Sequence, residues 1–236
     1  MMLQIRLLRS LAVIGLALAA FSLPAQDRKG TQAKVERKQV EIRTELGTMV
    51  VALYNETPAH RDNFLRLVRE GAYDSLLWHR VIRGFMVQGG DPDSRHVGPG
   101  TALGSGGPGY TLEAEILPGA IHKKGALAAA RQGDQVNPEK RSSGSQFYVV
   151  QGRTCSAEDL ERISERAARH GTPMNYTEEQ RRTYAEKGGA PHLDGAYTVF
   201  GEVVQGLEVI DKLAALPCDG RDRPLQDVHM FMRVIE

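Results

Sequence analysis

Short runs in which apolar and polar residues alternate fill most of the chain from residue 39 onward, and glycine or proline separates many of them. Successive side chains of a strand point to opposite faces, so this alternation predicts β-strands rather than helices. The predicted strands span residues 40–43, 48–53, 76–82, 85–88, 125–130, 146–150, 198–204 and 230–235. Many short strands between turn residues predict a mainly β protein.

Two segments carry the apolar stripe of an amphipathic helix, one early and one late in the strand series. The first begins at Thr57, which suits an N-cap, continues through Pro58 in the first turn and ends at Gly71. The second covers residues 207–215. A charged stretch at residues 155–187 predicts one or two exposed helices inserted between strands.

This order of elements favours a closed antiparallel β-barrel that carries a helical insertion. Closure leaves no exposed strand edge, which would otherwise invite pairing between molecules. The barrel domain is expected to span residues 39–236, and the polar, charged stretch at residues 26–38 is expected to be a flexible leader.

Residues 1–25 follow a different pattern. Arg6 and Arg9 precede an apolar run at residues 11–21, and the segment ends at Ala25. The run is shorter than the roughly 20 residues that cross a bilayer as a helix, so it predicts a secretory signal peptide cut after Ala25. A buried core helix is the alternative. The mature protein is expected to be exported, periplasmic or extracellular, without stable membrane insertion.

The composition is that of an ordinary soluble globular protein. The 236 residues are 41% hydrophobic and 25% charged, and 30 Lys and Arg residues balance 29 Asp and Glu residues. The formal net charge of +1 gives no support for nucleic-acid binding, which requires a basic surplus. Cys155 and Cys218 fit no zinc motif; they either pair or remain free thiols, and free thiols are favoured.

Several common cofactor and catalytic patterns are absent or stand in the wrong context. The segment from Gly104 to Gly109 matches G-x-G-x-x-G, but it contains Pro108 and precedes a strand-like run at residues 110–112. A dinucleotide site requires a following helix, so this segment is predicted to be a surface loop. The seven histidines form no His-x-x-x-His pair and no Gly-x-Ser-x-Gly elbow occurs, so neither a metal site nor a serine hydrolase is indicated.

The strongest candidate chemistry lies in residues 78–91, which read WHRVIRGFMVQGGD. Arg80 on one strand and Phe85 and Gln88 on the next would place a cation and an amide beside an apolar ring. Taken alone, an arginine within a β protein is more often a structural ion-pair partner.

This run resembles the signature of cyclophilin-type peptidyl-prolyl isomerases. Three further blocks resemble that family in the same order, at residues 48–71, 144–148 and 193–201. The four blocks extend across most of residues 40–236, and the chain resembles a bacterial exported form. The resemblance implies an eight-stranded antiparallel barrel capped by two helices, with the active face on its outside.

The resemblance also implies an activity, the cis–trans isomerisation of X-Pro bonds without metal or organic cofactor. The expected partners are proline-containing peptides and unfolded proteins, and the protein is expected to be a monomer. A non-catalytic peptide-binding or chaperone module on the same barrel is the alternative. The presence of Arg80, Phe85 and Gln146 favours the enzyme, because loss of any of them would have favoured binding alone.

Carried over position by position, the resemblance assigns the catalytic role to Arg80. The substrate-binding residues that it implies are His79, Phe85, Met86, Gln88, Ala130, Arg131, Gln146, Phe147, Tyr148, His192, Leu193 and Tyr197. Tyr148 stands where the best-known eukaryotic members carry phenylalanine, and Arg131 stands where the family often carries asparagine. His192 and Tyr197 replace a tryptophan and a histidine.

The physics of amide rotation suits an arginine. The X-Pro bond rotates over a resonance barrier of about 18–20 kcal/mol, and no covalent bond has to break. The nitrogen gains a lone pair in the twisted state, so a guanidinium that donates to it binds the twisted state better than the planar one. An apolar pocket anchors the proline ring while glutamine amides hold the chain.

Overall fold

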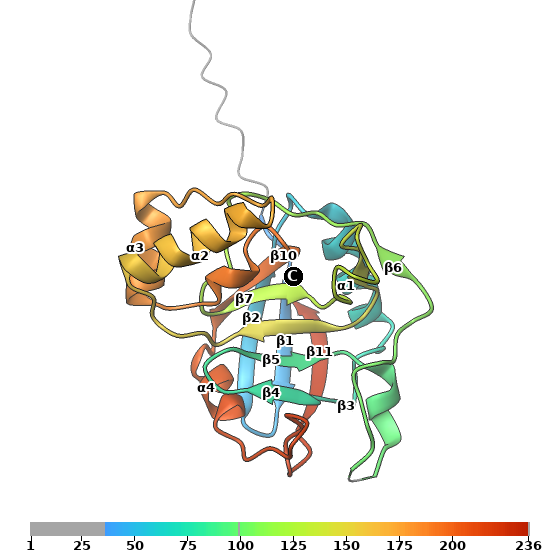
Figure 1. Cartoon of the computed structure of the whole chain (residues 1–236). Coiled ribbons are helices and arrows are strands. Elements are labelled where there is room, and N and C mark those ends of the chain that lie inside the picture. The colour runs from blue at the N-terminus through green and yellow to red at the C-terminus, as the bar shows by residue number, and fades with distance from the viewer. Residues whose placement is uncertain (1–35, 99, 236) are drawn as a thin grey trace, which may run out of the picture. The chain divides into compact units, whose positions relative to one another are not determined.

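The computed structural model describes residues 36–98 and 100–235 of the chain (Figure 1). The predicted signal peptide and most of the predicted leader lie outside the described residues. At the start of the described part, Arg37 forms an ion pair with Glu202 at 2.8 Å and lies over the ring of Tyr54. Among the described residues, none of the helices is long and apolar enough to cross a membrane.

Nine strands form one curled antiparallel sheet (Figure 1). In spatial order they are β3 (Leu76–Leu77), β11 (His229–Ile235), β1 (Gln39–Thr44), β2 (Gly47–Leu53), β10 (Val199–Gln205), β7 (Ala126–Ala129), β9 (Phe147–Val150), β5 (Met86–Gly89) and β4 (Arg80–Ile82). A separate two-stranded sheet pairs β6 (Thr111–Leu112) with β8 (Ser142–Ser143). Short 3-10 helices cover Pro92–His96 and Pro191–Leu193.

The sheet closes on itself through the backbone rather than through a strand pair. Its two outermost strands, β3 and β4, are consecutive in sequence, and only Trp78 and His79 separate them. The amide of Trp78 donates to the carbonyl of Val228 at 3.0 Å, and the amide of Val81 donates to the carbonyl of Asp222 at 2.8 Å. The mainly β, barrel-like fold is confirmed, with closure that is only approximate.

The strand count of the large sheet differs from the prediction at one place. Each predicted strand range contains one strand of the large sheet, except residues 76–82, which contain both β3 and β4. Trp78 and His79 continue the strand-like pattern but carry the chain from one edge of the sheet to the other. The sheet therefore has nine strands rather than eight.

Helices α1 (Pro58–Arg69) and α4 (Glu208–Ala214) confirm the two predicted capping helices. Each packs an apolar face onto the barrel core, and the side chains that do so are Phe64, Leu65, Leu67, Val68, Val209, Ile210 and Leu213. Burial of such side chains contributes about 1.5–3 kcal/mol each relative to full exposure.

The N-terminus of α1 is capped differently from the prediction. Thr57 occupies the N-cap position, but its side chain makes no capping hydrogen bond. Instead, the carboxylate of Glu115 accepts hydrogen bonds from the amides of Ala59 at 3.1 Å and His60 at 3.0 Å. A carboxylate at this position also interacts favourably with the helix dipole, so a distant residue has taken the role of the local cap.

The helical insertion contains α2 (Ala157–Arg169) and α3 (Glu178–Glu186), as predicted for residues 155–187. Both begin with a reciprocal capping box, formed by Ser156 with Asp159 and by Thr177 with Gln180. Figure 1 shows the two helices on the opposite side of the molecule from α1. Their buried contacts to the domain come from three residues in a small cluster of their own, Leu160, Tyr176 and Tyr184.

Candidate active site

The hairpin of β4 and β5 places Arg80 directly opposite Gln88. Directly paired residues of antiparallel strands lie on the same face, and Arg80 donates from Nη1 to Gln88 Oε1 at 3.4 Å. The tight turn between the strands uses Gly84 at φ +75°, and its amide donates to the side chain of Gln151 at 2.6 Å. The Arg80 side chain remains 43% exposed, so its guanidinium is open to a peptide at the surface.

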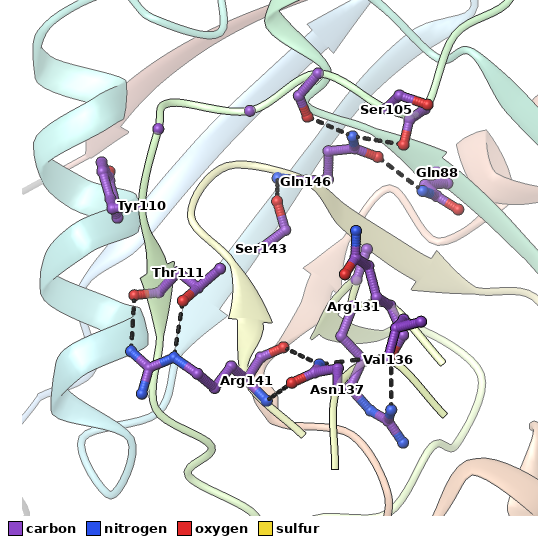
Figure 2. A pocket seen from close by; sticks show the side chains of 16 residues that line it. Gln88, Ser105, Tyr110, Thr111, Arg131, Val136, Asn137, Arg141, Ser143 and Gln146 are labelled. Atoms are coloured by element: carbon purple, nitrogen blue, oxygen red, sulfur yellow. Dashed lines mark hydrogen bonds between the residues drawn. The ribbon is translucent and has the colours of Figure 1, made fainter. Parts of the chain in front are cut away.

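A row of hydrogen bonds continues from Gln88. Gln88 Nε2 donates to Gln146 Oε1 at 3.0 Å, and Gln146 Nε2 donates to the carbonyls of Gly104 at 3.0 Å and Gly106 at 2.7 Å (Figure 2). Each donor in this row therefore points the same way, from Arg80 towards the segment from Gly104 to Gly109, called here the glycine-rich loop. Because every hydrogen of the Gln146 amide is used, the orientation of both glutamine side chains is fixed.

The glycine-rich loop is held from below by Asp91, a fully buried carboxylate. Asp91 accepts hydrogen bonds from the amides of Gly104, Gly106 and Asp93. A Cβ on Gly106 would lie 2.1 Å from the Asp91 carboxylate, so only glycine permits this close approach. The sequence analysis did not predict this role of the loop; the available signal was Asp91, a carboxylate that follows the predicted strand after two glycines.

A cavity of about 780 Å³ lies between the glycine-rich loop and residues 131–143 (Figure 2). Four of the predicted substrate-binding residues line it, namely Gln88, Ala130, Arg131 and Gln146. Arg131 is not free in this cavity: it pairs with Asp134 at 2.6 Å, donates to the carbonyl of Ala196 at 2.8 Å and lies 4.3 Å from the centre of the Tyr197 ring.

An apolar cluster on the outer face of the sheet gathers most of the other predicted site residues. Its members from that prediction are Phe85, Met86, Ala130, Tyr148, Leu193 and Tyr197. His192 joins them, because its ring lies 5.2 Å from that of Phe85. The rings of Tyr148 and Tyr197 meet edge to face at 6.0 Å. Arg80 and this cluster meet on the hairpin of β4 and β5, which carries Arg80, Phe85 and Met86.

Phe147 lies elsewhere, in the interior of the barrel. Its ring packs edge to face against Phe64 at 5.5 Å, Tyr73 at 5.6 Å and Trp78 at 5.6 Å. Neighbouring residues of a strand point to opposite faces, so Phe147 and Tyr148 cannot both face the outer cluster. The structure thus separates Phe147 from the other predicted substrate-binding residues.

His79 is also buried, at 3% exposure, beneath the glycine-rich loop. A Cβ on Gly104 would lie 3.7 Å from its Nε2 atom. Burial lowers the pKa of His79 to about 4, against the opposing effect of the Asp91 carboxylate. The ring is therefore neutral near pH 7 and supports the loop rather than facing solvent.

Asp222 is a second neighbour of Arg80 that the sequence did not reveal. Its Oδ2 lies 3.5 Å from Arg80 Nε, whereas Gln88 Oε1 accepts from Nη1 of the same guanidinium. Asp222 adopts φ +65°, and Asp219 fixes the turn around it by accepting from the amides of Arg221 at 2.8 Å and Arg223 at 3.0 Å. A constrained turn thus presents this carboxylate to the arginine.

The described residues hold no group of three or more His, Cys, Asp or Glu side chains placed to bind a metal ion. Cys155 and Cys218 are free thiols and lie partly buried. The arrangement on the outer face is an arginine, a fixed row of amides and an apolar cluster. Such a set can hold a peptide and stabilise developing lone-pair density, and it contains no paired nucleophile and base.

Comparison with known proteins agrees with this arrangement. Residues 39–233 match the family model described as cyclophilin type peptidyl-prolyl cis-trans isomerase/CLD. A putative peptidyl-prolyl cis-trans isomerase of Staphylococcus aureus (strain USA300) is 34% identical over 194 residues, which cover 80% of this chain and 87% of the relative. A putative bifunctional phosphatase/peptidyl-prolyl cis-trans isomerase of Streptococcus pyogenes serotype M6 is 35% identical over 198 residues, and the chain spans 37% of that longer protein.

Solved structures show the same fold. A crystal structure of a cyclophilin-type isomerase from Cryptosporidium parvum matches 85% of this chain and 98% of its own with a TM-score of 0.59 at 23% identity. A second crystal structure of that protein, in the presence of the dipeptide Ala-Pro, matches 84% of this chain and 99% of its own with a TM-score of 0.58.

The fold and the outer face together define a barrel-like β protein with an exposed arginine, a row of amides and an apolar cluster on one face. The chain belongs to the cyclophilin-type peptidyl-prolyl cis-trans isomerase family. It is an isomerase, and members of its family bind proline-containing peptides. The resemblance drawn from the four sequence blocks is thereby confirmed.

Proposed function

We propose that this isomerase accelerates rotation about X-Pro bonds of exported proteins during their folding, with Arg80 as the catalytic residue. The observation that carries the assignment is the position of Arg80. It is a partly exposed cation paired with Gln88, on the hairpin that also supplies Phe85 and Met86 to the apolar cluster. A peptide whose proline ring enters the cluster brings its X-Pro nitrogen towards this guanidinium.

Arg80 acts on the twisted state of the bond. Rotation removes the C–N double-bond character, and the nitrogen lone pair that results accepts a hydrogen bond from a guanidinium N–H. Arginine suits this role because its charge is permanent and its donors have a rigid geometry. An interaction that lowers the barrier by about 7 kcal/mol would accelerate rotation about 10⁵-fold.

The neighbours of Arg80 keep its donors aimed. Gln88 Oε1 accepts from Nη1 and the Asp222 carboxylate lies beside Nε, so two contacts restrain the guanidinium while 43% of the side chain stays exposed. Both hydrogens of the Gln146 amide are bonded to glycine carbonyls. We therefore assign Gln146 to orienting Gln88 and the loop, and assign the apolar cluster to holding the proline ring.

The catalytic assignment is tested with a prolyl-peptide isomerisation assay on the chain from Gln26 onward, before and after the substitution Arg80→Ala. We expect kcat/KM to fall about 10²–10³-fold, the loss typical of one removed transition-state donor. Arg83→Ala is the matched control, because Arg83 is exposed on the same hairpin. Equal rates for Arg80→Ala and the unchanged protein would remove Arg80 from the catalytic role.

A peptide-binding module is the competing function. It predicts that the unchanged protein binds an Ala-Pro peptide without accelerating its isomerisation, and the same assay detects this outcome directly. The family membership and the exposed Arg80 favour the enzyme.

Export is supported by the basic start, short apolar run and terminal Ala25 of residues 1–25. Cell fractionation followed by mass spectrometry tests it. We expect a mature protein that starts at Gln26 outside the cytoplasm. Full-length, uncut protein in the cytosol would overturn this part of the proposal.

A further inference from the structure

The hydroxyl group of Tyr148 leads from the apolar cluster into a buried chain of polar groups. Tyr148 is 4% exposed, and its hydroxyl lies 3.0 Å from Nε2 of His122, which has no exposed surface. The two rings are nearly parallel, 12° apart, with centroids separated by 6.1 Å. Where a family member carries phenylalanine at this position, no such bond can form.

The ring of His122 is fixed from its other side by Asp194. Nδ1 of His122 lies 2.8 Å from Asp194 Oδ1, and the same oxygen accepts from the backbone amide of His122 at 2.8 Å. A carboxylate only accepts hydrogen bonds, so Nδ1 of His122 carries a proton and donates to Asp194, and Nε2 faces the Tyr148 hydroxyl. Burial raises the pKa of Tyr148 well above its ordinary value, so this hydroxyl keeps its hydrogen.

The second oxygen of Asp194 belongs to the helical insertion. Its Oδ2 accepts hydrogen bonds from the hydroxyl of Tyr184, on α3, at 2.5 Å and from the hydroxyl of Tyr176, which precedes α3, at 3.0 Å. Asp194 is 7% exposed and Tyr184 has no exposed surface. A carboxylate buried to this degree requires donors on every side, and the insertion supplies half of those that the structure gives it.

Asp194 also lies next in sequence to Leu193, which contributes to the apolar cluster from the 3-10 helix Pro191–Leu193. One carboxylate therefore fixes two parts of the cluster, Leu193 through the chain and Tyr148 through His122. The side-chain hydrogen bonds of this chain do not include a side chain of the β4–β5 hairpin; Tyr148 itself lies on β9, where it pairs with Gln88 of β5 through the backbone ladder.

We propose that the insertion at residues 155–187 is a positioning element for the proline pocket, acting from Tyr184 through Asp194 and His122 on the ring of Tyr148. The inference rests on the proposed function, in that it takes the apolar cluster as the site of the proline ring. Asp194, His122 and Tyr184 are positioning residues, since none of them lines the surface of the cluster. Loss of the chain of hydrogen bonds impairs substrate binding more than the catalytic step.

A double-mutant cycle with two tyrosine-to-phenylalanine substitutions tests this inference. Tyr184→Phe removes a hydroxyl from the insertion, and we expect KM for an Ala-Pro tetrapeptide to rise about three- to tenfold with kcat changed less than twofold. In the Tyr148→Phe background the chain is already broken at its other end, so Tyr184→Phe has no additional effect on KM. Thr183→Ala is the matched control, because its hydroxyl bonds only within α3.

A spectroscopic signature separates positioning from general stability. The ¹⁵N resonance of His122 Nε2 shifts in Tyr184→Phe and in Tyr148→Phe, and it does not shift in Thr183→Ala. If Tyr184→Phe does not fold, Tyr176→Phe removes the other hydroxyl from the same carboxylate and replaces it in the cycle.

Two outcomes overturn the inference: an unchanged KM in a folded Tyr184→Phe protein, or the same increase in KM in both Tyr148 backgrounds. Either of them leaves the isomerase activity of the unchanged protein intact, so the proposed function stands. If the unchanged protein has no isomerase activity, the proposed function fails instead. The cycle is then judged on the Kd of the four proteins for the same peptide.

Discussion

Arg80 and Tyr148 both belong to the outer face of the barrel, but their surroundings differ in almost every physical respect. The Arg80 side chain is 43% exposed and its neighbours Gln88 and Asp222 lie at 3.4 and 3.5 Å. Tyr148 is 4% exposed, and the hydrogen bonds behind it, from His122 to Asp194 and on to Tyr184, span 2.5–3.0 Å.

The difference matches the two tasks that the reaction sets. The group that stabilises the twisted bond has to remain accessible to a peptide in solvent, and its neighbours need only orient it. The surface that anchors the proline ring has to stay fixed while the bond rotates, so that rotation occurs at one place. Buried, fully bonded polar groups provide that fixity, because breaking any one of them leaves an unsatisfied partner away from water.

The largest effect is expected from a substitution in the buried chain of hydrogen bonds behind Tyr148. Asp194→Ala removes the acceptor of four buried donors, and we expect the free energy of unfolding to fall by about 3–5 kcal/mol. Denaturant unfolding measures it. Asp62→Ala is the control, because Asp62 is 63% exposed and pairs on the surface of α1. A loss for Asp194→Ala no larger than that of the control would mean that the chain behind Tyr148 contributes little.

An intermediate effect is expected from protonation of His79, the buried residue that precedes Arg80 in sequence. Its pKa is lowered to about 4 by burial, so between pH 4 and its ordinary value of 6.5 the unfolded chain binds more protons than the folded protein. The contribution of His79 to stability is therefore complete above pH 6.5 and is lost as the pH falls towards 4, a change of at most roughly 3 kcal/mol.

Urea unfolding at pH 4.5 and 7.5, on the unchanged protein and on His79→Gln, measures this contribution. We expect the variant to lose less stability on acidification, because glutamine does not titrate. Burial also lowers the pKa of His60 and His192, so the difference between the two proteins is the informative quantity. Equal losses of stability in the two proteins on acidification would show that His79 does not cause the acid sensitivity.

The smallest effect is expected from Asp222. Asp222→Asn keeps the shape of the side chain and its tolerance of positive φ but removes the charge beside Arg80 Nε. We expect kcat to fall about three- to tenfold with KM and stability unchanged, because exposed ion pairs contribute little to folding. Steady-state kinetics with Asp62→Asn as a control tests this. A change in KM alone would show that Asp222 contributes to substrate binding rather than to the action of Arg80.

The sequence predicted the site residues that lie close together in the chain better than the distant residues that hold them in place. Arg80 and Gln88 follow from the pairing of two predicted strands across one hairpin, and the register places them directly opposite each other. Phe85 lies in the turn before β5 and belongs to the outer apolar cluster. His122 and Asp194 are 72 residues apart in sequence, and no local pattern links them. The grouping of Asp91 with the glycine-rich loop depends in the same way on how distant segments meet.

Two departures in the fold have the same origin. The local rule for helix caps favoured Thr57, yet the carboxylate of Glu115 reaches the helix from a distant segment. The pattern of residues 76–82 does not predict that the strand is interrupted. Trp78 and His79, which interrupt it, are as buried as core strand residues. In both places a tertiary contact overrides the local preference.

The link at Trp78 and His79 has a consequence for how the chain is made. The strand that β3 needs as its partner is β11, at the C-terminal end, and β11 also covers the outer edge of β1. Neither the first strand nor the closing link can be completed until the last strand has left the ribosome. Such long-range pairing is slow and keeps apolar faces open during synthesis. Under the proposed export, this late completion would preserve the unfolded state that passage through a narrow translocation channel requires.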